Sequence, residues 1–141
     1  MSTRRKAREC ALQLLYQWEG ERGDPAALLP AFWRGKKADA ATREFAENLF
    51  HGTVAQLEEI DTLIECHSEH WKLERMAAVD RALLRLAVQE LQAHPETPRA
   101  VVIDEALEIA RRFSSADSVE FINGVLDAVR KTLESQTPSS P

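Results

Sequence analysis

Apolar residues recur at intervals of three and four along nearly the whole chain, and no segment shows the strict alternation of a half-buried strand. A helical repeat of 3.6 residues gathers positions with this spacing on one face. In a helix expected from Thr3 to about Glu19, the buried face consists of Ala7, Cys10, Ala11, Leu14 and Trp18. The pattern predicts an all-α protein, and 141 residues are enough for a single domain with a continuous core.

Capping residues divide the first half of this pattern into helices. Asp24, followed by proline, is expected to cap a short second helix, and Asp39 a third. The third is predicted to continue unbroken through Ile64, with Gly52 marking a close contact with another helix.

Helices are also expected in the second half, from Glu74 to about Ala93 and from Thr97-Pro98 through a buried Phe113. Asp117 and Glu120 have the spacing of a capping box for the last helix, in which Gly124 is expected to let a neighbouring helix approach. We expect one domain over residues 1–134 and a disordered tail over residues 135–141, whose sequence SQTPSSP has nothing to bury.

Cysteine usage and hydropathy point to the cytoplasm. Cys10 and Cys66 form no CxxC motif and no disulfide framework, which favours a reducing compartment. A signal peptide has an uninterrupted apolar segment after its basic residues, whereas polar residues interrupt this one. No apolar run is long enough to cross a membrane.

Four cations, Arg4, Arg5, Lys6 and Arg8, lie within the first eight residues. The chain has 18 Lys and Arg against 23 Asp and Glu, so the remainder has 14 cations, 23 acids and a net charge of −9. Cations at a helix N-terminus are unfavourable because that end already carries partial positive charge. An anionic partner explains them, and a short RNA strand fits better than a long duplex, which the acidic remainder would repel. The alternative is a solvated basic terminus.

Helix geometry separates these cations. Arg4 and Arg8 project to one flank of the buried face, whereas Arg5, Leu12 and Tyr16 are expected on a separate exposed strip. Tyr16 could offer a surface on which a base stacks.

No constellation indicates catalysis, a cofactor or a metal. Cys66, His67 and His70 lie close in sequence, but no second pair completes a zinc site. The acids Asp104, Glu105 and Glu108 have no nearby acid–base partner and are interpreted as structural, and no glycine-rich phosphate motif is present. The chain is therefore predicted not to be an enzyme.

Three blocks, from Thr3 to about Val129, carry a family resemblance: RRKARECALQLLYQWE, VDRALLRLAVQEL and PRAVVIDEALEIARRFSSADSVEFINGVLDAV. In this order they resemble the NusB transcription antitermination factors. The resemblance implies about six or seven helices arranged as two small bundles. It also implies binding of a single-stranded boxA element in ribosomal RNA leader transcripts, together with NusE, a small-subunit ribosomal protein, and the RNA polymerase antitermination complex.

The resemblance also implies roles for individual residues. Arg4, Arg5, Lys6 and Arg8 would hold phosphates, and replacing Arg5 and Arg8 by Ala is expected to weaken RNA binding while leaving the thermal midpoint nearly unchanged.

Phe121 matches an aromatic expected to stack on a base, although Glu120 beside it would repel phosphate and packing is the alternative. Tyr16 and Asp80 match positions expected toward NusE. For Tyr16 this replaces the stacking role.

A second hypothesis from a different class remains. The basic helix could dock on an acidic surface of a second copy, which would make the protein a homo-oligomeric interaction module or a homodimer that hides its RNA site.

Overall fold

The protein is described by a computed structural model over residues 3–68 and 72–136. Within these residues all regular structure is helical, which confirms the all-α prediction. The elements in chain order are α1 (Thr3–Glu21), the 3₁₀ turn η1 (Pro25–Leu28), α2 (Leu29–Trp33), α3 (Ala40–Ala55), α4 (Leu57–Cys66), the 3₁₀ turn η2 (Leu73–Arg75), α5 (Ala78–Ala93), α6 (Arg99–Phe113) and α7 (Ala116–Gln136).

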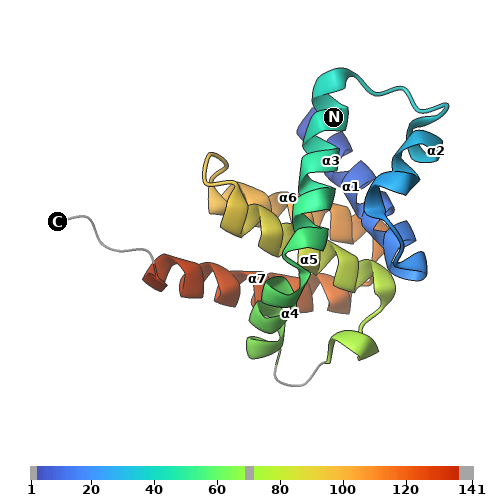
Figure 1. Cartoon of the computed structure of the whole chain (residues 1–141). Coiled ribbons are helices and arrows are strands. Elements are labelled where there is room, and N and C mark those ends of the chain that lie inside the picture. Colours follow the sequence, from blue (N-terminus) through green and yellow to red (C-terminus); the bar gives the residue numbers. More distant parts are fainter. Residues whose placement is uncertain (1–2, 69–71, 137–141) are drawn as a thin grey trace.

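The helices form two small bundles that share α5. In the N-terminal bundle α1 packs along α3, and η1 packs against α1 and α2 (Figure 1). In the C-terminal bundle α5 packs against α4, α6 and α7. Because α5 also contacts α1 and α3, it joins the two bundles, and the arrangement expected from the family resemblance is confirmed.

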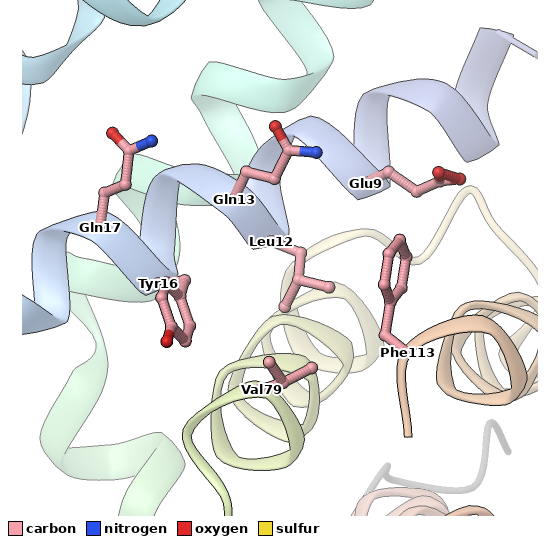
Figure 2. A pocket seen from close by; sticks show the side chains of 7 residues that line it. All are labelled: Glu9, Leu12, Gln13, Tyr16, Gln17, Val79 and Phe113. Carbon is pink, nitrogen blue, oxygen red and sulfur yellow. The ribbon is translucent and has the colours of Figure 1, made fainter. Parts of the chain in front are cut away.

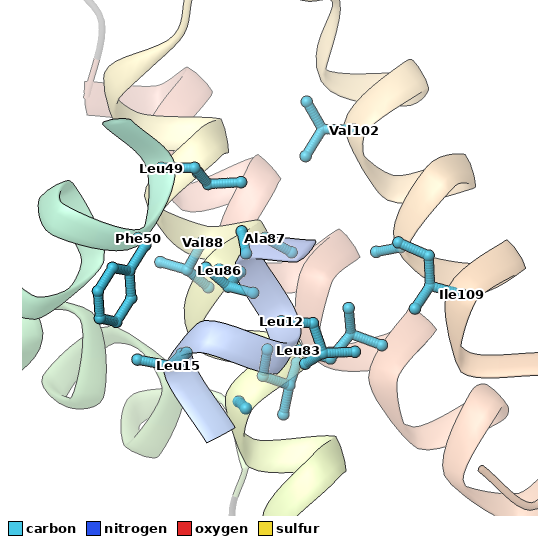
Figure 3. Packing of buried hydrophobic residues seen from close by; sticks show 14 of the residues in the cluster. Leu12, Leu15, Leu49, Phe50, Leu83, Leu86, Ala87, Val88, Val102 and Ile109 are labelled. Atoms are coloured by element: carbon cyan, nitrogen blue, oxygen red, sulfur yellow. The ribbon is translucent and has the colours of Figure 1, made fainter. Parts of the chain in front are cut away.

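One continuous apolar core fills the space around α5 (Figure 3). Leu12 and Leu15 enter it from α1, Phe50 from α3 and Ile109 from α6. The stripe predicted for the first helix is buried throughout. Since burial of apolar side chains is the main stabilising contribution in folding, this core holds α1 firmly in place.

Two predicted helix caps are present. Asp24 accepts a hydrogen bond from the amide of Ala26 at 3.1 Å, and Asp39 accepts one from the amide of Thr42 at 2.8 Å. The bonds with Thr42 lower the pKa of Asp39 below its ordinary value. Each carboxylate satisfies an amide that the helix leaves without an internal acceptor.

The prediction of one unbroken helix from Asp39 through Ile64 is wrong, because the helix is interrupted at Gln56. There φ is −107° and ψ is 19°, outside the helical range. The break changes the direction of the chain, so α4 buries Ile60 and Ile64 toward α5 and α7 while α3 stays against α1. A straight helix could not serve both bundles.

The two glycine predictions have opposite outcomes. A Cβ atom at Gly52 would lie 2.6 Å from Nε2 of Gln89, so the predicted close helix contact is confirmed, and the helix that approaches is α5. A Cβ atom at Gly124 would meet nothing within 4 Å, so the predicted helix approach there is wrong. Gly124 lies on the exposed face of α7.

The start of α7 also differs from the prediction. Ser115 accepts the hydrogen bond from the amide of Ser118 at 3.1 Å, whereas Asp117 lies exposed in the first turn. Ser115 is therefore the cap, and the capping box predicted with Asp117 is wrong. The helix extends through Gln136, into the segment predicted as a tail, and the rest of that segment lies outside the described residues.

None of the helices within the described ranges has the length and apolar character required to cross a bilayer.

Candidate nucleic-acid interface

The cations of the first turn of α1 leave the helix in different directions. Arg4 is exposed, and its guanidinium carbon Cζ lies 4.1 Å from the centroid of the Phe45 ring on α3. Cζ of Arg8 lies 5.4 Å from the same centroid. The shared flank predicted for these two arginines is therefore confirmed.

Arg8 is nevertheless buried, with 7% of its surface exposed. Its Nε donates to Oε1 of Glu90 on α5 at 2.8 Å, and its Nη2 donates to Oε2 at 2.5 Å. Glu90 is itself only 2% exposed. A two-bond arginine–carboxylate pair in this position fixes α1 on α5. This burial contradicts the expectation of an accessible cation. Because Glu90 would be left buried without its cation, we now expect that removing Arg8 lowers stability.

Arg5 projects toward α6 and pairs with Glu105. Its Nε lies 2.6 Å from Oε2 and its Nη2 lies 3.2 Å from Oε1 of that carboxylate. The Arg5 side chain remains 34% exposed. The hydrogen bonds from Arg5 lower the pKa of Glu105 below its ordinary value. Glu105 therefore forms a structural ion pair, and Arg5 remains partly exposed although it is paired.

Lys6 projects toward the segment between α2 and α3, where its ammonium group donates a hydrogen bond to the backbone carbonyl of Lys37. This contact brings Lys36 and Lys37 beside the first turn of α1, and all three lysines are exposed. Sequence reasoning treated the stretch GKKAD only as a loop and missed these two residues. Their adjacent positive charges in a polar segment were the signal that could have identified them.

A groove of about 300 Å³ lies near the middle of α1, between this helix and the ends of α5 and α6. Figure 2 shows Tyr16 and Leu12 on the side of α1 that faces Val79 and Phe113. Tyr16 is 50% exposed, as expected, and Phe113 is 47% exposed, so its predicted burial is wrong. Leu12 is only 6% exposed, so it does not belong to an exposed strip. We call this hollow the Tyr16–Phe113 groove.

Comparison with known proteins decides the family. A model of the NusB family matches residues 5–131. The chain belongs to the NusB family. The transcription antitermination protein NusB of Koribacter versatilis (strain Ellin345) is 52% identical over 135 residues, which cover 95% of this chain and 92% of the relative.

Solved structures agree. NusB of T. maritima superposes with a TM-score of 0.83 at 36% identity, covering 93% of this chain and 92% of that chain. A chain from a crystal structure of the antitermination factors NusB and NusE in complex with dsRNA gives a TM-score of 0.82 at 30% identity. That match covers 94% of this chain and 98% of the other.

Two of the residues that the family resemblance singles out line the same hollow: Asp80 in the first turn of α5 and Phe121 in α7. Asp80 is 8% exposed and accepts hydrogen bonds from the hydroxyls of Ser114 and Ser118, the latter at 2.8 Å. Phe121 is half-buried and lines a hollow of about 340 Å³ beside Asp80. In this structure the Asp80 carboxylate therefore holds the first turn of α7, and its role toward NusE stays a prediction.

The residues predicted as site residues from the family resemblance do not form one continuous patch. Arg8 contacts Glu90, whereas Phe121 lies beside Asp80. Asp80 and Glu90 are about 15 Å apart along α5, at 1.5 Å per residue. The structure brings Arg4 and Lys6 close to α3 and the segment before it, and it places Tyr16 in the groove near the N-terminal end of α5.

The expected absence of a metal site was based on Cys66, His67 and His70. In the described part of the chain, no group of three His, Cys, Asp or Glu residues is placed to hold a metal ion, and His70 lies outside that part. His67 instead shares a hydrogen bond with the Thr132 hydroxyl at 2.9 Å.

Proposed function

We propose that this chain is a nonenzymatic RNA-binding adaptor of transcription antitermination. Its RNA target is a boxA-like single strand in ribosomal RNA leader transcripts, and it acts with NusE and the RNA polymerase antitermination complex. Membership of the NusB family supports this function, because relatives are transcription antitermination proteins. A further support is the similarity to a chain from a solved assembly of NusB and NusE with dsRNA.

One observation carries the RNA-binding part of the proposal. The bond from Lys6 to the Lys37 carbonyl joins exposed cations from two separate segments into one surface. We define the basic surface as Arg4, Arg5, Lys6, Lys36 and Lys37. The chain after residue 8 has a net charge of −9. A polyanion is therefore attracted to the basic surface and repelled by the acidic remainder of the protein.

The contacts of each cation suggest different roles. Lys6, Lys36 and Lys37 are exposed point charges suited to phosphate, and Arg5 adds a half-exposed guanidinium. Arg8 acts indirectly, because its pairing with Glu90 holds α1 in position. The small size of this surface favours a short single strand, which can touch it without approaching the acidic remainder.

The protein partner occupies the Tyr16–Phe113 groove in this proposal. The two exposed aromatic rings, with Val79 between α1 and α6, form an apolar surface of the kind that protein interfaces bury. Tyr16 is also the residue that family resemblance directs toward NusE. Asp80 contributes indirectly, by fixing the start of α7.

The RNA-binding role is tested by titrating short boxA-like and scrambled RNA over about 50 to 200 mM salt. Replacing Lys36 and Lys37 together by Ala is expected to weaken binding and to reduce the magnitude of the salt slope by about 1.4, because each phosphate contact contributes about 0.7 for single strands. Lys72 and Lys131 are exposed lysines of the second half of the chain, and their double Ala variant is the matched control.

The outcomes are distinct. Equal affinity and slope in both double variants would contradict the assignment of this basic surface. Size measurement with and without RNA tests the alternative, since a stable dimer that shields the basic surface and excludes RNA would favour self-association.

The partner surface is tested separately by replacing Tyr16 and Phe113 with Ala. Capture of NusE is expected to fall at least about tenfold, as for central aromatic contacts, while RNA affinity of the isolated protein stays unchanged. Val101 is an equally exposed apolar residue of α6 that does not line the groove, so Val101→Ala is the control. Undiminished NusE capture by the double variant would reject the groove as the partner site.

A further inference from the structure

Beside Arg4 lies another hollow, of about 320 Å³, which the family resemblance did not predict. It lies between the first turn of α1, the first half of α3 and the link from α5 to α6. Its main polar and aromatic lining residues are Arg4, Glu44, Phe45, Asn48, His94 and Glu96.

Arg4 is held in place on one side of this hollow. Its guanidinium lies 4.1 Å from the Phe45 centroid, and Phe45 is itself only 8% exposed and flanked by the His94 ring at 5.9 Å between centroids. The cation–aromatic contact restricts the Arg4 side chain while leaving it exposed to solvent. A planar, weakly hydrated guanidinium fixed in this way is a stacking surface for another planar group.

Other lining residues of the hollow provide hydrogen-bond acceptors. Glu44 and Asn48 are exposed, and neither side chain has a hydrogen-bond or ion-pair partner among the described residues. The Glu96 carboxylate lies 3.0 Å from Nδ1 of His94, and its pKa is lowered by its own backbone amide and by this contact. Two carboxylates in one hollow repel phosphate but attract N–H donors.

These features fit a nucleobase rather than a phosphate. Guanine has adjacent N1–H and N2–H₂ donors, which match the two oxygens of one carboxylate, and further acceptors that an amide can reach. Uracil offers a single N–H between two carbonyl oxygens, which a carboxylate repels. Single-stranded RNA exposes these base edges for recognition, usually together with stacking on aromatic or arginine planes.

We propose that this hollow is a guanine-recognition subsite. The base stacks on Arg4, its N1–H and N2–H₂ groups donate hydrogen bonds to the Glu44 carboxylate, and Asn48 is a further contact. The inference rests on the proposed RNA-binding function and extends it from backbone attraction to base selection. Lys6 lies two residues further along the same turn and holds the adjoining phosphates, so the base turns toward α3 while the backbone follows the basic surface.

The test uses the full-length protein and three labelled RNA decamers. One contains only uridine, and the other two are oligouridine with one central guanosine or one central inosine. The three probes have the same phosphate charge, so differences in affinity report the base. The guanosine decamer is expected to bind at least about fivefold more tightly than the uridine decamer. Inosine lacks the N2 amino group, and its decamer is expected to fall between the other two.

Two variants test whether the residues of this hollow cause the guanosine preference. Glu44→Gln is expected to remove most of the guanosine preference, and Arg4→Lys is expected to reduce it while keeping the salt slope, since the charge is retained but the stacking plane is lost. Lys6→Ala is the control, because it should weaken all three decamers by the same factor. Thermal midpoints of these exposed variants verify that each is folded.

Equal binding of the guanosine and uridine decamers would overturn the subsite while leaving RNA binding through the basic surface intact. A guanosine preference that persists in both Glu44→Gln and Arg4→Lys would place base recognition elsewhere and would also overturn it. Failure of every decamer to bind even at low salt would overturn the subsite, whereas the proposed function itself is rejected only if the boxA-like RNA also fails to bind.

Discussion

Arg4 and Arg8 lie one helical turn apart on the same flank of α1, yet their surroundings are opposite. Arg4 is exposed and rests on the Phe45 ring, whereas Arg8 is 7% exposed and bound by two hydrogen bonds to Glu90. Two like side chains on one face thus belong to two regions, a basic surface and a buried charged layer.

The buried charged layer extends beyond Arg8. Arg85 on α5 pairs with Glu19 of α1 and, at 2.8 Å, with Asp61 of α4. These pairs cross between helices of both bundles. A buried charge is tolerated only with its partner, so the acids contributed by α5, α1 and α4 determine which cations are structural.

The largest expected effect separates the two regions directly. Arg8→Ala leaves the Glu90 carboxylate buried without its cation and is expected to lower the free energy of unfolding by about 3–5 kcal/mol. Chemical denaturation measures this loss. Arg4→Ala is the matched variant on the exposed side and should change stability much less, so similar losses in both would remove the distinction. Replacing Arg8 and Glu90 together by Met and Leu should recover most of the loss.

A second test examines a buried carboxylate that has hydroxyl partners instead of a cation. Asp80→Asn weakens the bonds from Ser114 and Ser118 and is expected to cost about 1–3 kcal/mol of unfolding free energy. Asp117→Asn changes an exposed acid in the first turn of α7, the helix whose start Asp80 holds, and should change the unfolding free energy by no more than about 0.5 kcal/mol. Equal thermal midpoints for the two variants would show that Asp80 has no special part in fixing α7.

Arg5 shares a property with each region, because it is paired with Glu105 and is still partly exposed. Glu105→Gln removes the carboxylate charge that competes with RNA phosphate for Arg5, so RNA affinity is expected to rise about threefold, as for a weak surface pair. Glu108→Gln alters a neighbouring acid that pairs with Arg111 and should give a smaller rise. An unchanged or reduced affinity in Glu105→Gln would mean that Arg5 does not contact RNA.

The smallest effect is a pH dependence at the same pair. Since Arg5 lowers the folded-state pKa of Glu105 below 4.5, the pair stabilises the fold above that value and loses its contribution as the pH falls through the folded-state pKa. Carboxyl NMR titration should show Glu105 protonating at lower pH in the native protein than in Arg5→Gln. Coincident titration curves would contradict this coupling.

Much of the fold was predictable from local patterns. The periodicity of three and four gave the helices, and Asp24 and Asp39 capped them as expected, because these interactions are completed within a few residues. Gly52 was correctly interpreted as a close contact. The break at Gln56 was not predictable, since it depends on α4 turning toward helices that come later in the chain.

Some features of the candidate site could likewise be predicted from the sequence, and others could not. Clustered positive charge at the start of the chain, and an exposed Tyr16, were visible in the linear order of residues. The pairing of Arg8 with Glu90, the burial of Asp80, the exposure of Phe113 and the approach of Lys36 and Lys37 to Lys6 were not.

Local composition dictated that this chain is helical, acidic overall and basic at its first turn, because helix periodicity and charge are properties of neighbouring residues. Which cations remain available to a ligand was settled by contacts across the folded chain: Glu90 lies 82 positions from Arg8 and Glu105 lies 100 positions from Arg5. Electrostatic pairing depends on separation in space and on exclusion of water, and both arise only when α1 is packed against α5 and α6.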